Sequence, residues 1–312
     1  MGGDFAPGPI VEGVAAAARR FPTTVRLVGP VATLEAALAQ YADRARLAVI
    51  TVDAPDVVGM DETPTSALRR KPGASIRVAV QQVADGHASA VVSAGSTGAT
   101  VMAARTGLGL IAGVERPALA AVIPTKQRPA ILLDVGANAE CRPGHLVQFG
   151  VMGAVFAQIA LDLERPRVGL LSIGEEASKG NELTREAHWR LTQAPVQFVG
   201  NVEARDVYAG VADVIVCDGF TGNVVLKTSE SLVDMIETLA GGALSAAVGR
   251  RLDAAEYGGA LLLGVNGVVI VGHGRSSATA VENAIGLAHR YSVERLVARL
   301  AGGIAAIPVS AT

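Results

Sequence analysis

Residues Ala90–Thr100, AVVSAGSTGAT, begin as a short apolar run, break into glycine and hydroxyl residues, and resume as a helix-compatible segment. This order predicts a strand, a turn and a helix. Glycine permits close backbone approaches that a Cβ would forbid, so amide N–H groups can converge on one point. The positive end of the helix dipole would add to a phosphate site there. A turn that merely joins a strand to a helix explains the sequence about equally well. The candidate phosphate-binding residues are Ser93, Gly95, Ser96, Thr97 and Gly98.

The composition is that of a globular α/β protein. The chain has 312 residues, of which 50% are hydrophobic and 4% aromatic, and its formal net charge is −2. This charge gives no support for nucleic-acid binding. Two cysteines form neither a zinc motif nor a secreted disulfide framework, so we expect no metal and a cytoplasmic location. The apolar stretch at residues 260–271 is interrupted by glycine and asparagine and falls short of a membrane span.

Apolar runs alternate with helix-compatible segments along the chain, which predicts a mostly parallel sheet covered by helices in three α/β/α layers. We expect residues 53–75, with three prolines, to form a long irregular surface loop. We also expect one terminal helix ending near residue 300. Strands are expected at 24–29, 47–52, 90–93, 118–123, 130–135, 168–172, 196–199, 214–217 and 268–271, and the main helices at 9–21, 31–42, 76–85, 98–112 and 145–163.

Further polar turns follow the predicted strands, where α/β sheets bind ligands. Lys179 could supply a positive charge to phosphate. Asn181 could donate to a ligand or simply cap a helix, and these readings are equally good. Asn223 follows the next strand along the chain, while Asn138 and His273 are second choices. A satisfied core histidine explains His273 slightly better than a site role.

The sequence contains no nucleophile elbow and no metalloprotease motif, so the predicted site binds an oxyanion but lacks an obvious protein nucleophile. This suits a reaction in which phosphate itself attacks. Phosphate is already an anion at neutral pH and needs mainly orientation and oxyanion stabilisation. A thioester is a matching electrophile, because its thiol can leave as a thiolate with little help from an acid.

The chain resembles the bacterial phosphate acyltransferases of the PlsX family over nearly its whole length. The segments that carry this resemblance are, in order, MGGDFAP, SAGSTGA, LDVGAN, KGNELT, FVGNVEARD, CDGFTGNVVLKT, EYGG and GHGRSSATAVENAI. The resemblance implies conversion of acyl-[acyl carrier protein] and inorganic phosphate to acyl phosphate and free carrier protein. The product would feed an acyl-phosphate-using glycerol-3-phosphate acyltransferase in phospholipid synthesis. It further implies a fold like that of phosphotransacetylase and isopropylmalate dehydrogenase, no cofactor, a homodimer, and loose attachment to the inner face of the membrane.

Two departures from the family pattern stand out. Members usually carry a strand with an aspartate just before MGGD, and here that strand is expected to be absent. Within a single domain over residues 1–312, the helical dimerisation segment near 228–256 is shorter than usual. We therefore expect an amphipathic remnant around 235–252 that can still pair with its dimer mate, whereas its alanine and glycine content predicts little burial in lipid and at most weak peripheral membrane contact.

The acidic carrier protein is expected to dock on the basic cluster Arg69, Arg70 and Lys71, although a solvated surface is the simpler reading of such a patch. Two other functions stay open. A nicotinamide-dependent dehydrogenase of the same broad fold would need a dinucleotide fingerprint, and the glycines at 107, 109 and 113 lie within a predicted helix, where packing explains them better. A non-catalytic scaffold that binds acyl carrier protein would tolerate loss of Lys179.

Overall fold

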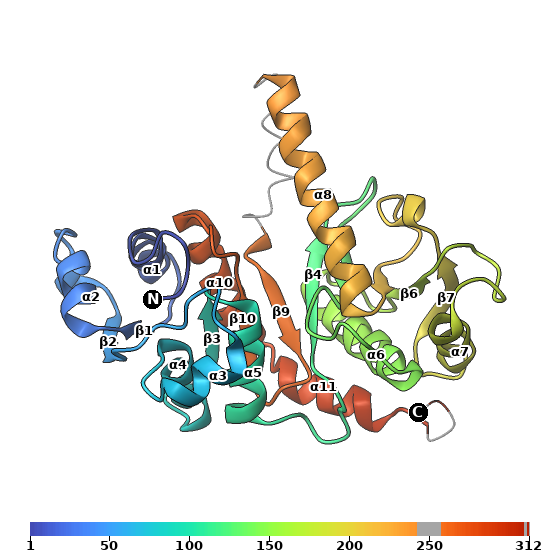
Figure 1. Ribbon diagram of the computed structural model, residues 1–312, viewed down its shortest axis with the longest axis horizontal. Helices are drawn as coiled ribbons and strands as arrows, with labels where there is room; N and C mark the ends of the chain where they lie inside the picture. The colour runs from blue at the N-terminus through green and yellow to red at the C-terminus, as the bar shows by residue number, and fades with distance from the viewer. Residues whose placement is uncertain (242–256, 309–310, 312) are drawn as a thin grey trace. The chain divides into compact units, whose positions relative to one another are not determined.

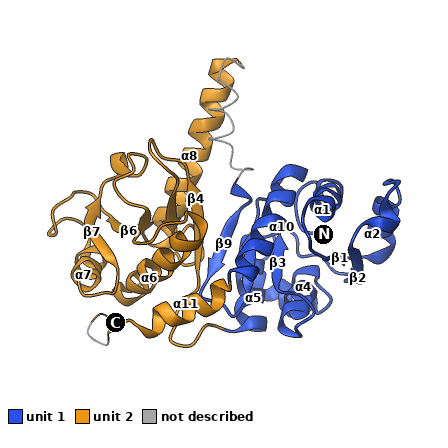
Figure 2. Ribbon diagram, turned by 180° about the vertical axis from the view of Figure 1, so that it is seen from behind, with its two compact units in different colours: residues 1–109, 254–294 blue, residues 110–253, 295–312 orange. Residues whose placement is uncertain are grey.

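A computed structural model describes residues 1–241, 257–308 and 311, shown in Figure 1. The chain forms two compact units, coloured separately in Figure 2. Unit 1 comprises Met1–Gly109 and Ala254–Glu294, and unit 2 comprises Leu110–Asp253 and Arg295–Thr312. The single domain expected over residues 1–312 stays a prediction. Of the helical segment expected near 228–256 and the remnant at 235–252, residues 242–256 lie outside the described part.

Unit 1 contains two groups of strands. Strand β1 pairs in parallel with β2, while β10 pairs in parallel with β3 and antiparallel with β9. Helices α1 and α10 pack on each other, as do α4 and α5, and both pairs contact the strands (Figure 1). The elements are α1 (Gly8–Arg20), β1 (Val25–Gly29), α2 (Val31–Leu38), β2 (Val49–Asp53), α3 (Pro64–Arg70), α4 (Ser75–Ala84), β3 (Ala90–Ser93), α5 (Thr97–Leu108), β9 (Ala260–Leu263), β10 (Val268–Val271) and α10 (Ala278–Val293), with a 3-10 turn at Arg44–Arg46.

Unit 2 is built on five strands in the order β4-β5-β8-β6-β7, in which β4 is antiparallel to β5 and the remaining pairs are parallel. The strands β5 and β8 are buried along their whole length, as their uninterrupted apolar sequences predict. The elements are β4 (Ala118–Ile123), β5 (Ala130–Leu133), α6 (Pro143–Ala160), β6 (Arg167–Leu171), α7 (Glu182–Leu191), β7 (Gln197–Val202), β8 (Val214–Val216), α8 (Gly219–Ala240) and α11 (Leu296–Ala305), with a 3-10 turn at Ala204–Asp206.

These parallel strands and their covering helices confirm the predicted α/β fold, and most expected elements are found within a few residues of their predicted ends. Among the helices of the described residues, none has the length and apolarity needed to cross a membrane.

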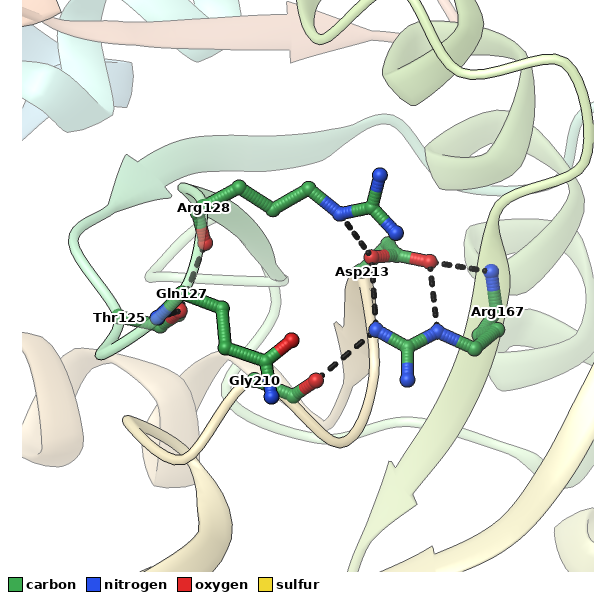
Figure 3. Close-up of polar contacts among 6 residues, drawn as sticks. All are labelled: Thr125, Gln127, Arg128, Arg167, Gly210 and Asp213. Carbon is green, nitrogen blue, oxygen red and sulfur yellow. Dashed lines mark hydrogen bonds and ion pairs between the residues drawn. The ribbon is translucent and has the colours of Figure 1, made fainter.

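The amino ends of the unit 2 strands are joined by an ionic cluster (Figure 3). The buried Asp213 carboxylate accepts hydrogen bonds from the Nε and backbone N–H of Arg167 at 3.0 and 2.9 Å, and Arg128 Nε lies 3.2 Å from it. Burial raises the pKa of Asp213, but the hydrogen bonds and charge of Arg167, with the charge of Arg128, outweigh this and lower it. This cluster occupies the amino ends of these strands, and the candidate site residues of unit 2 follow their opposite, carboxyl ends.

Residues 53–75 are more ordered than predicted. Pro64 begins helix α3, which buries Ala67 and Leu68, and Asp56 forms a β-bridge with Ala74. The prediction of an irregular loop was wrong there because proline is well suited to the first turn of a helix and marks no break at that position.

The expected terminal helix is also divided, and one strand was missed. Arg295 has a left-handed backbone with φ 54°, which ends α10 and allows α11 to begin at Leu296. Strand β9 was overlooked because its short run ALLL carries no alternation. By contrast, the packing interpretation of Gly107 is supported, since a Cβ there would lie 2.5 Å from Val80 of α4.

Candidate functional site

The turn after β3 presents two exposed backbone donors. Ser96 caps α5, because its hydroxyl accepts a hydrogen bond from Ala99 N and its carbonyl accepts one from Thr100 N at 2.9 Å. The preceding N–H groups, of Thr97 and Gly98, have no acceptor among the described residues, and both residues are exposed. The first turn of α5 contains no acidic residue. This helix end can therefore bind an anion with two N–H groups.

Two other residues predicted to bind phosphate stabilise the turn itself. The Ser93 hydroxyl accepts a hydrogen bond from Gly95 N at 3.3 Å and lies 3.0 Å from the Thr100 hydroxyl. Gly95 is buried under Gly2, where a Cβ on Gly2 would lie 2.6 Å from the Gly95 Cα. Glycine is thus needed here for close backbone approach. The atoms of this turn that are best placed for a ligand belong to Thr97 and Gly98.

His273 lies beyond β10, the parallel neighbour of β3, so the two strand ends meet at one edge of unit 1. The residue is exposed, which rules out the interpretation as a core histidine. Its carbonyl accepts hydrogen bonds from the backbone N–H and hydroxyl of Ser276, at 3.0 and 2.7 Å. The imidazole therefore belongs to the solvent-accessible edge that also carries the start of α5.

In unit 2, the loop after β5 is organised by a buried carboxylate that was not among the predicted site residues. Asp134 accepts backbone hydrogen bonds from Gly136, Ala137 and Asn138 at 2.8–3.0 Å. It also accepts one from Leu119 of β4, at 3.0 Å. Burial raises the pKa of Asp134, and these hydrogen bonds partly oppose the rise. The signal for this role in the sequence is that Asp134 is the single charged residue in the apolar run AILLDV, near its end.

Asn138 serves the same loop. Its side-chain amide donates to the Pro117 carbonyl at 2.7 Å and to Asp134 at 2.9 Å, and the residue is buried. The Asn138 carbonyl accepts the N–H of Gly219 at 2.8 Å, which attaches the start of α8 to the loop. Asn138 therefore positions the two strand ends, and its donors are already used within the protein.

Asn223 lies on the first turns of α8, against the same loop. A Cβ on Gly136 would lie 3.6 Å from the Asn223 side-chain oxygen, and Asn223 is exposed. This approach requires Gly222, because a Cβ there would overlap the Asp134 carbonyl oxygen. The structure thus brings Asn138 and Asn223 together at the ends of β5 and β8, with Asn223 the more accessible of the two.

Lys179 and Asn181 lie on the loop between β6 and α7. Lys179 is exposed and its side-chain stem lies over Gly174, while no described carboxylate forms an ion pair with its ammonium. Asn181 caps α7, because its side-chain oxygen accepts a hydrogen bond from Thr184 N at 2.9 Å. That oxygen is occupied, so a ligand would be left with the amide nitrogen. No described contact joins this loop to Asn223.

The residues of the basic cluster in unit 1, Arg69, Arg70 and Lys71, differ in how closely a carboxylate already pairs with them. Lys71 forms a close ion pair with Glu62 and also donates to the Val57 carbonyl at 2.8 Å. Arg70 lies 3.7 Å from Glu62 and its side chain is 68% exposed. Arg69 is exposed, and no ion pair to it is described. Arg69 and Arg70 therefore offer more charge to a partner than Lys71 does.

Neither cysteine is suited to attack a substrate. Burial, with smaller contributions from the charges of Asp134 and Asp218, raises the pKa of Cys141 to about 12. The same causes raise the pKa of Cys217 still more clearly, and that residue is buried. Thiols with such pKa values are protonated at neutral pH and are poor nucleophiles.

Comparison with known proteins gives a consistent result. The family model described as "Fatty acid synthesis protein" matches residues 1–299. A phosphate acyltransferase of Desulforudis audaxviator (strain MP104C) is 51% identical over 320 residues, covering 97% of this chain and 94% of the relative. One of Heliobacterium modesticaldum is 48% identical over 316 residues, covering 96% and 94%.

The structural comparisons concern the fold alone. A phosphotransacetylase from Streptococcus pyogenes superposes with a TM-score of 0.66 at 19% identity, covering 91% of each chain. A branched-chain phosphotransacylase from Enterococcus faecalis V583 gives 0.58 at 16% identity, covering 93% of this chain and 96% of that one. These similarities confirm the predicted resemblance in fold. The family model and the sequence relatives establish that this chain belongs to the phosphate acyltransferase family of enzymes.

Proposed function

We propose that this enzyme transfers the acyl group of acyl-[acyl carrier protein] to inorganic phosphate, giving acyl phosphate and free carrier protein for phospholipid synthesis. The observation that carries the proposal is the start of α5, where Thr97 and Gly98 are exposed and their N–H groups lack described acceptors. The starts of α7 and α8 suit an anion less well, because Glu182 and Asp218 place carboxylates there.

In the proposed reaction, a phosphate oxygen attacks the thioester carbonyl carbon and forms a C–O bond. The carbonyl electrons move to oxygen and then return as the C–S bond breaks. The carrier thiol leaves as a thiolate and takes a proton from water, so no oxidant, metal or protein nucleophile is needed. The raised pKa of Cys141 supports direct attack by phosphate over an acylated cysteine.

In unit 1, we place phosphate at the Thr97 and Gly98 amides. In unit 2, we assign Lys179 as the source of positive charge. Asn223, with the remaining amide donor of Asn181, stabilises the oxyanion that develops on the carbonyl oxygen. Ser93, Gly95 and Ser96 keep the turn in shape, and His273 and Asn138 stay secondary candidates.

The carrier protein is acidic, so we place its docking on the exposed guanidinium groups of Arg69 and Arg70, with Lys71 contributing less. The second half of α8 leaves Leu232, Met235, Ile236 and Leu239 between 44% and 78% exposed. This apolar face supports the proposals of a homodimer and of weak contact with the inner face of the membrane. The acyl phosphate would pass to an acyl-phosphate-using glycerol-3-phosphate acyltransferase.

The test mixes the enzyme with palmitoyl-[acyl carrier protein] and phosphate, traps acyl phosphate with hydroxylamine, and measures release of the carrier thiol. Both products should appear in equal amounts, with phosphate present, and should be lost in Lys179→Ala. Lys227→Ala is the matched control, because Lys227 is also exposed but pairs with Glu230 at 2.8 Å. Carrier binding without either product would contradict the proposal and favour a scaffold.

A further inference from the structure

The loop between β6 and α7, which carries Lys179, contains a short turn that ends at that residue. The Glu176 carbonyl accepts a hydrogen bond from Lys179 N at 3.0 Å, which closes a turn over residues 176–179. The stem of Lys179 lies over Gly174, where an added Cβ would be 2.8 Å from the Lys179 Cγ. The position of the exposed ammonium group therefore depends on how this turn is held.

Asn201, near the end of β7, holds this turn from outside the loop. Its side-chain nitrogen donates to the Glu176 carbonyl at 2.9 Å, and the residue is buried. The same carbonyl accepts the N–H of Lys179, and a backbone carbonyl can take two donors because it has two lone pairs. Asn201 is therefore joined to the backbone of Lys179 through one shared oxygen atom.

His188 fixes the direction in which the Asn201 amide points. It belongs to α7, which packs on β7 (Figure 1), and its Nδ1 lies 2.8 Å from the Asn201 side-chain oxygen. Because the Glu176 carbonyl can only accept, the amide nitrogen of Asn201 must face it and the amide oxygen must face His188. The Nδ1 atom of His188 must then carry a proton, in the neutral and in the charged imidazole alike.

An irregularity in β7 turns Asn201 toward this histidine. The Phe198 ring packs edge-on against the His188 ring, with 5.1 Å between their centroids, yet residues three apart on a regular strand point to opposite faces. In β7, Phe198 and Gly200 pair with consecutive residues of β6, so one extra residue lies between them. Gly200 adopts φ 96°, which favours glycine. Such a bulge redirects the side chains that follow it, and Asn201 consequently shares a face with Phe198.

These contacts form a continuous connection from α7 through Asn201 to the backbone of Lys179. Two exposed arginines also contact the loop: Arg185 donates to the Gly180 carbonyl at 3.0 Å and Arg205 to the Glu175 carboxylate at 3.2 Å. Hydrogen bonds made by a buried side chain constrain a loop more than exposed charged contacts do. The contact made by Asn201 is therefore the one best suited to fix the turn.

We infer that Asn201, oriented by His188, is a positioning residue that sets the place of Lys179 for phosphate. This inference rests on the charge that the proposed function assigns to Lys179. Asn201 itself touches no substrate, because its nitrogen and oxygen are both used within unit 2. Its removal should therefore weaken the use of phosphate in the same way as a displaced Lys179 would.

The test begins with Asn201→Leu, since leucine has nearly the same shape and offers neither donor nor acceptor. The KM for phosphate should rise roughly three- to tenfold while the KM for palmitoyl-[acyl carrier protein] stays unchanged. A loss of folded enzyme alone would lower kcat and leave both KM values unchanged. Gln197→Leu is the matched control, because Gln197 is exposed on the same strand and its side chain makes no described hydrogen bond.

His188 supplies a second pair of variants, which also answers the question if Asn201→Leu does not fold. His188→Asn places a donor nitrogen the same number of bonds from the backbone as Nδ1 and should keep the KM for phosphate near its original value. His188→Leu has no donor and should raise that KM as Asn201→Leu does. Equal KM values for phosphate in the two His188 variants would overturn the inference.

A double-mutant cycle tests whether Asn201 acts through Lys179. In a Lys179→Ala background, Asn201→Leu should change kcat/KM for phosphate by less than about twofold, whereas in a Lys227→Ala background it should have its full effect. A full further loss in the Lys179→Ala background would overturn the inference, because Asn201 would then act by another route.

Hydrogen exchange at the Lys179 amide reports on the turn independently of activity. Asn201→Leu should speed this exchange at least about fivefold relative to Gln197→Leu. Faster exchange together with unchanged activity of Lys179→Ala would overturn the proposed role of Lys179 and still support its positioning by Asn201. Unchanged exchange in a folded Asn201→Leu enzyme would overturn the inference, whatever the activity of that enzyme.

Discussion

Replacing Thr97 with proline tests the anion site by removing one backbone donor and little else. Thr97 is the first residue of α5, where proline is tolerated because the N–H has no helical acceptor. The preceding Ser96 has φ −54° and ψ 120°, which is compatible with a following proline. Thr97 is exposed, so the ring of the introduced proline should lie in solvent. The variant should therefore fold with nearly unchanged stability.

The expected effect is weaker binding of phosphate. A hydrogen bond to a charged group contributes about 1.5–3 kcal/mol, which corresponds to a rise of about 10- to 150-fold in the KM for phosphate. The assay is thiol release from palmitoyl-[acyl carrier protein] at varied phosphate, with Tm measured in parallel. Thr97→Ala is the control, since it removes the hydroxyl and keeps the N–H. An unchanged KM in a folded Thr97→Pro enzyme, or equal effects of the two variants, would refute the reasoning.

Three further predictions concern packing, charge and thiol chemistry. Gly222→Ala should lose about 1–3 kcal/mol of unfolding free energy in urea because its Cβ would overlap the Asp134 carbonyl oxygen, whereas Gly8→Ala, with no atom within 4 Å of the added Cβ, should lose almost none. Asp213→Asn should cost about 3 kcal/mol at pH 7. The folded-state pKa of Asp213 lies below the ordinary 3.8, so this difference should be complete above about pH 4 and shrink as pH falls through the lower folded-state value; a pH-independent difference would contradict it. Cys141, with a pKa of about 12, should react slowly with iodoacetamide at pH 8, and Cys141→Ser should retain activity.

The local parts of the fold could be predicted because their causes are local. The apolar run before Ser93 and the capping side chain of Ser96 lie within a few residues of each other, and both β3 and α5 were found as expected. The cap made by Asn181 was also one of the two stated readings. Helix caps and short buried strands depend on neighbouring residues, so a single sequence contains their signal.

The parts that could not be predicted depend on contacts between distant residues. Asp134 accepts a hydrogen bond from Leu119, and no pattern in the sequence joins these two positions. The ion pair with Glu62 similarly reduces the positive charge that Lys71 can offer to a partner, and the sequence alone does not show this pairing.

The most direct test of the central claim is to follow the phosphate oxygens and the acyl group separately. The enzyme is mixed with palmitoyl-[acyl carrier protein], first without phosphate and then with phosphate labelled at all four oxygens with ¹⁸O. Direct attack predicts no thiol release and no acylated enzyme in the intact mass spectrum before phosphate is added. It then predicts acyl phosphate that carries all four labels. A phosphate-independent burst of thiol with an acyl adduct on the enzyme would contradict the account.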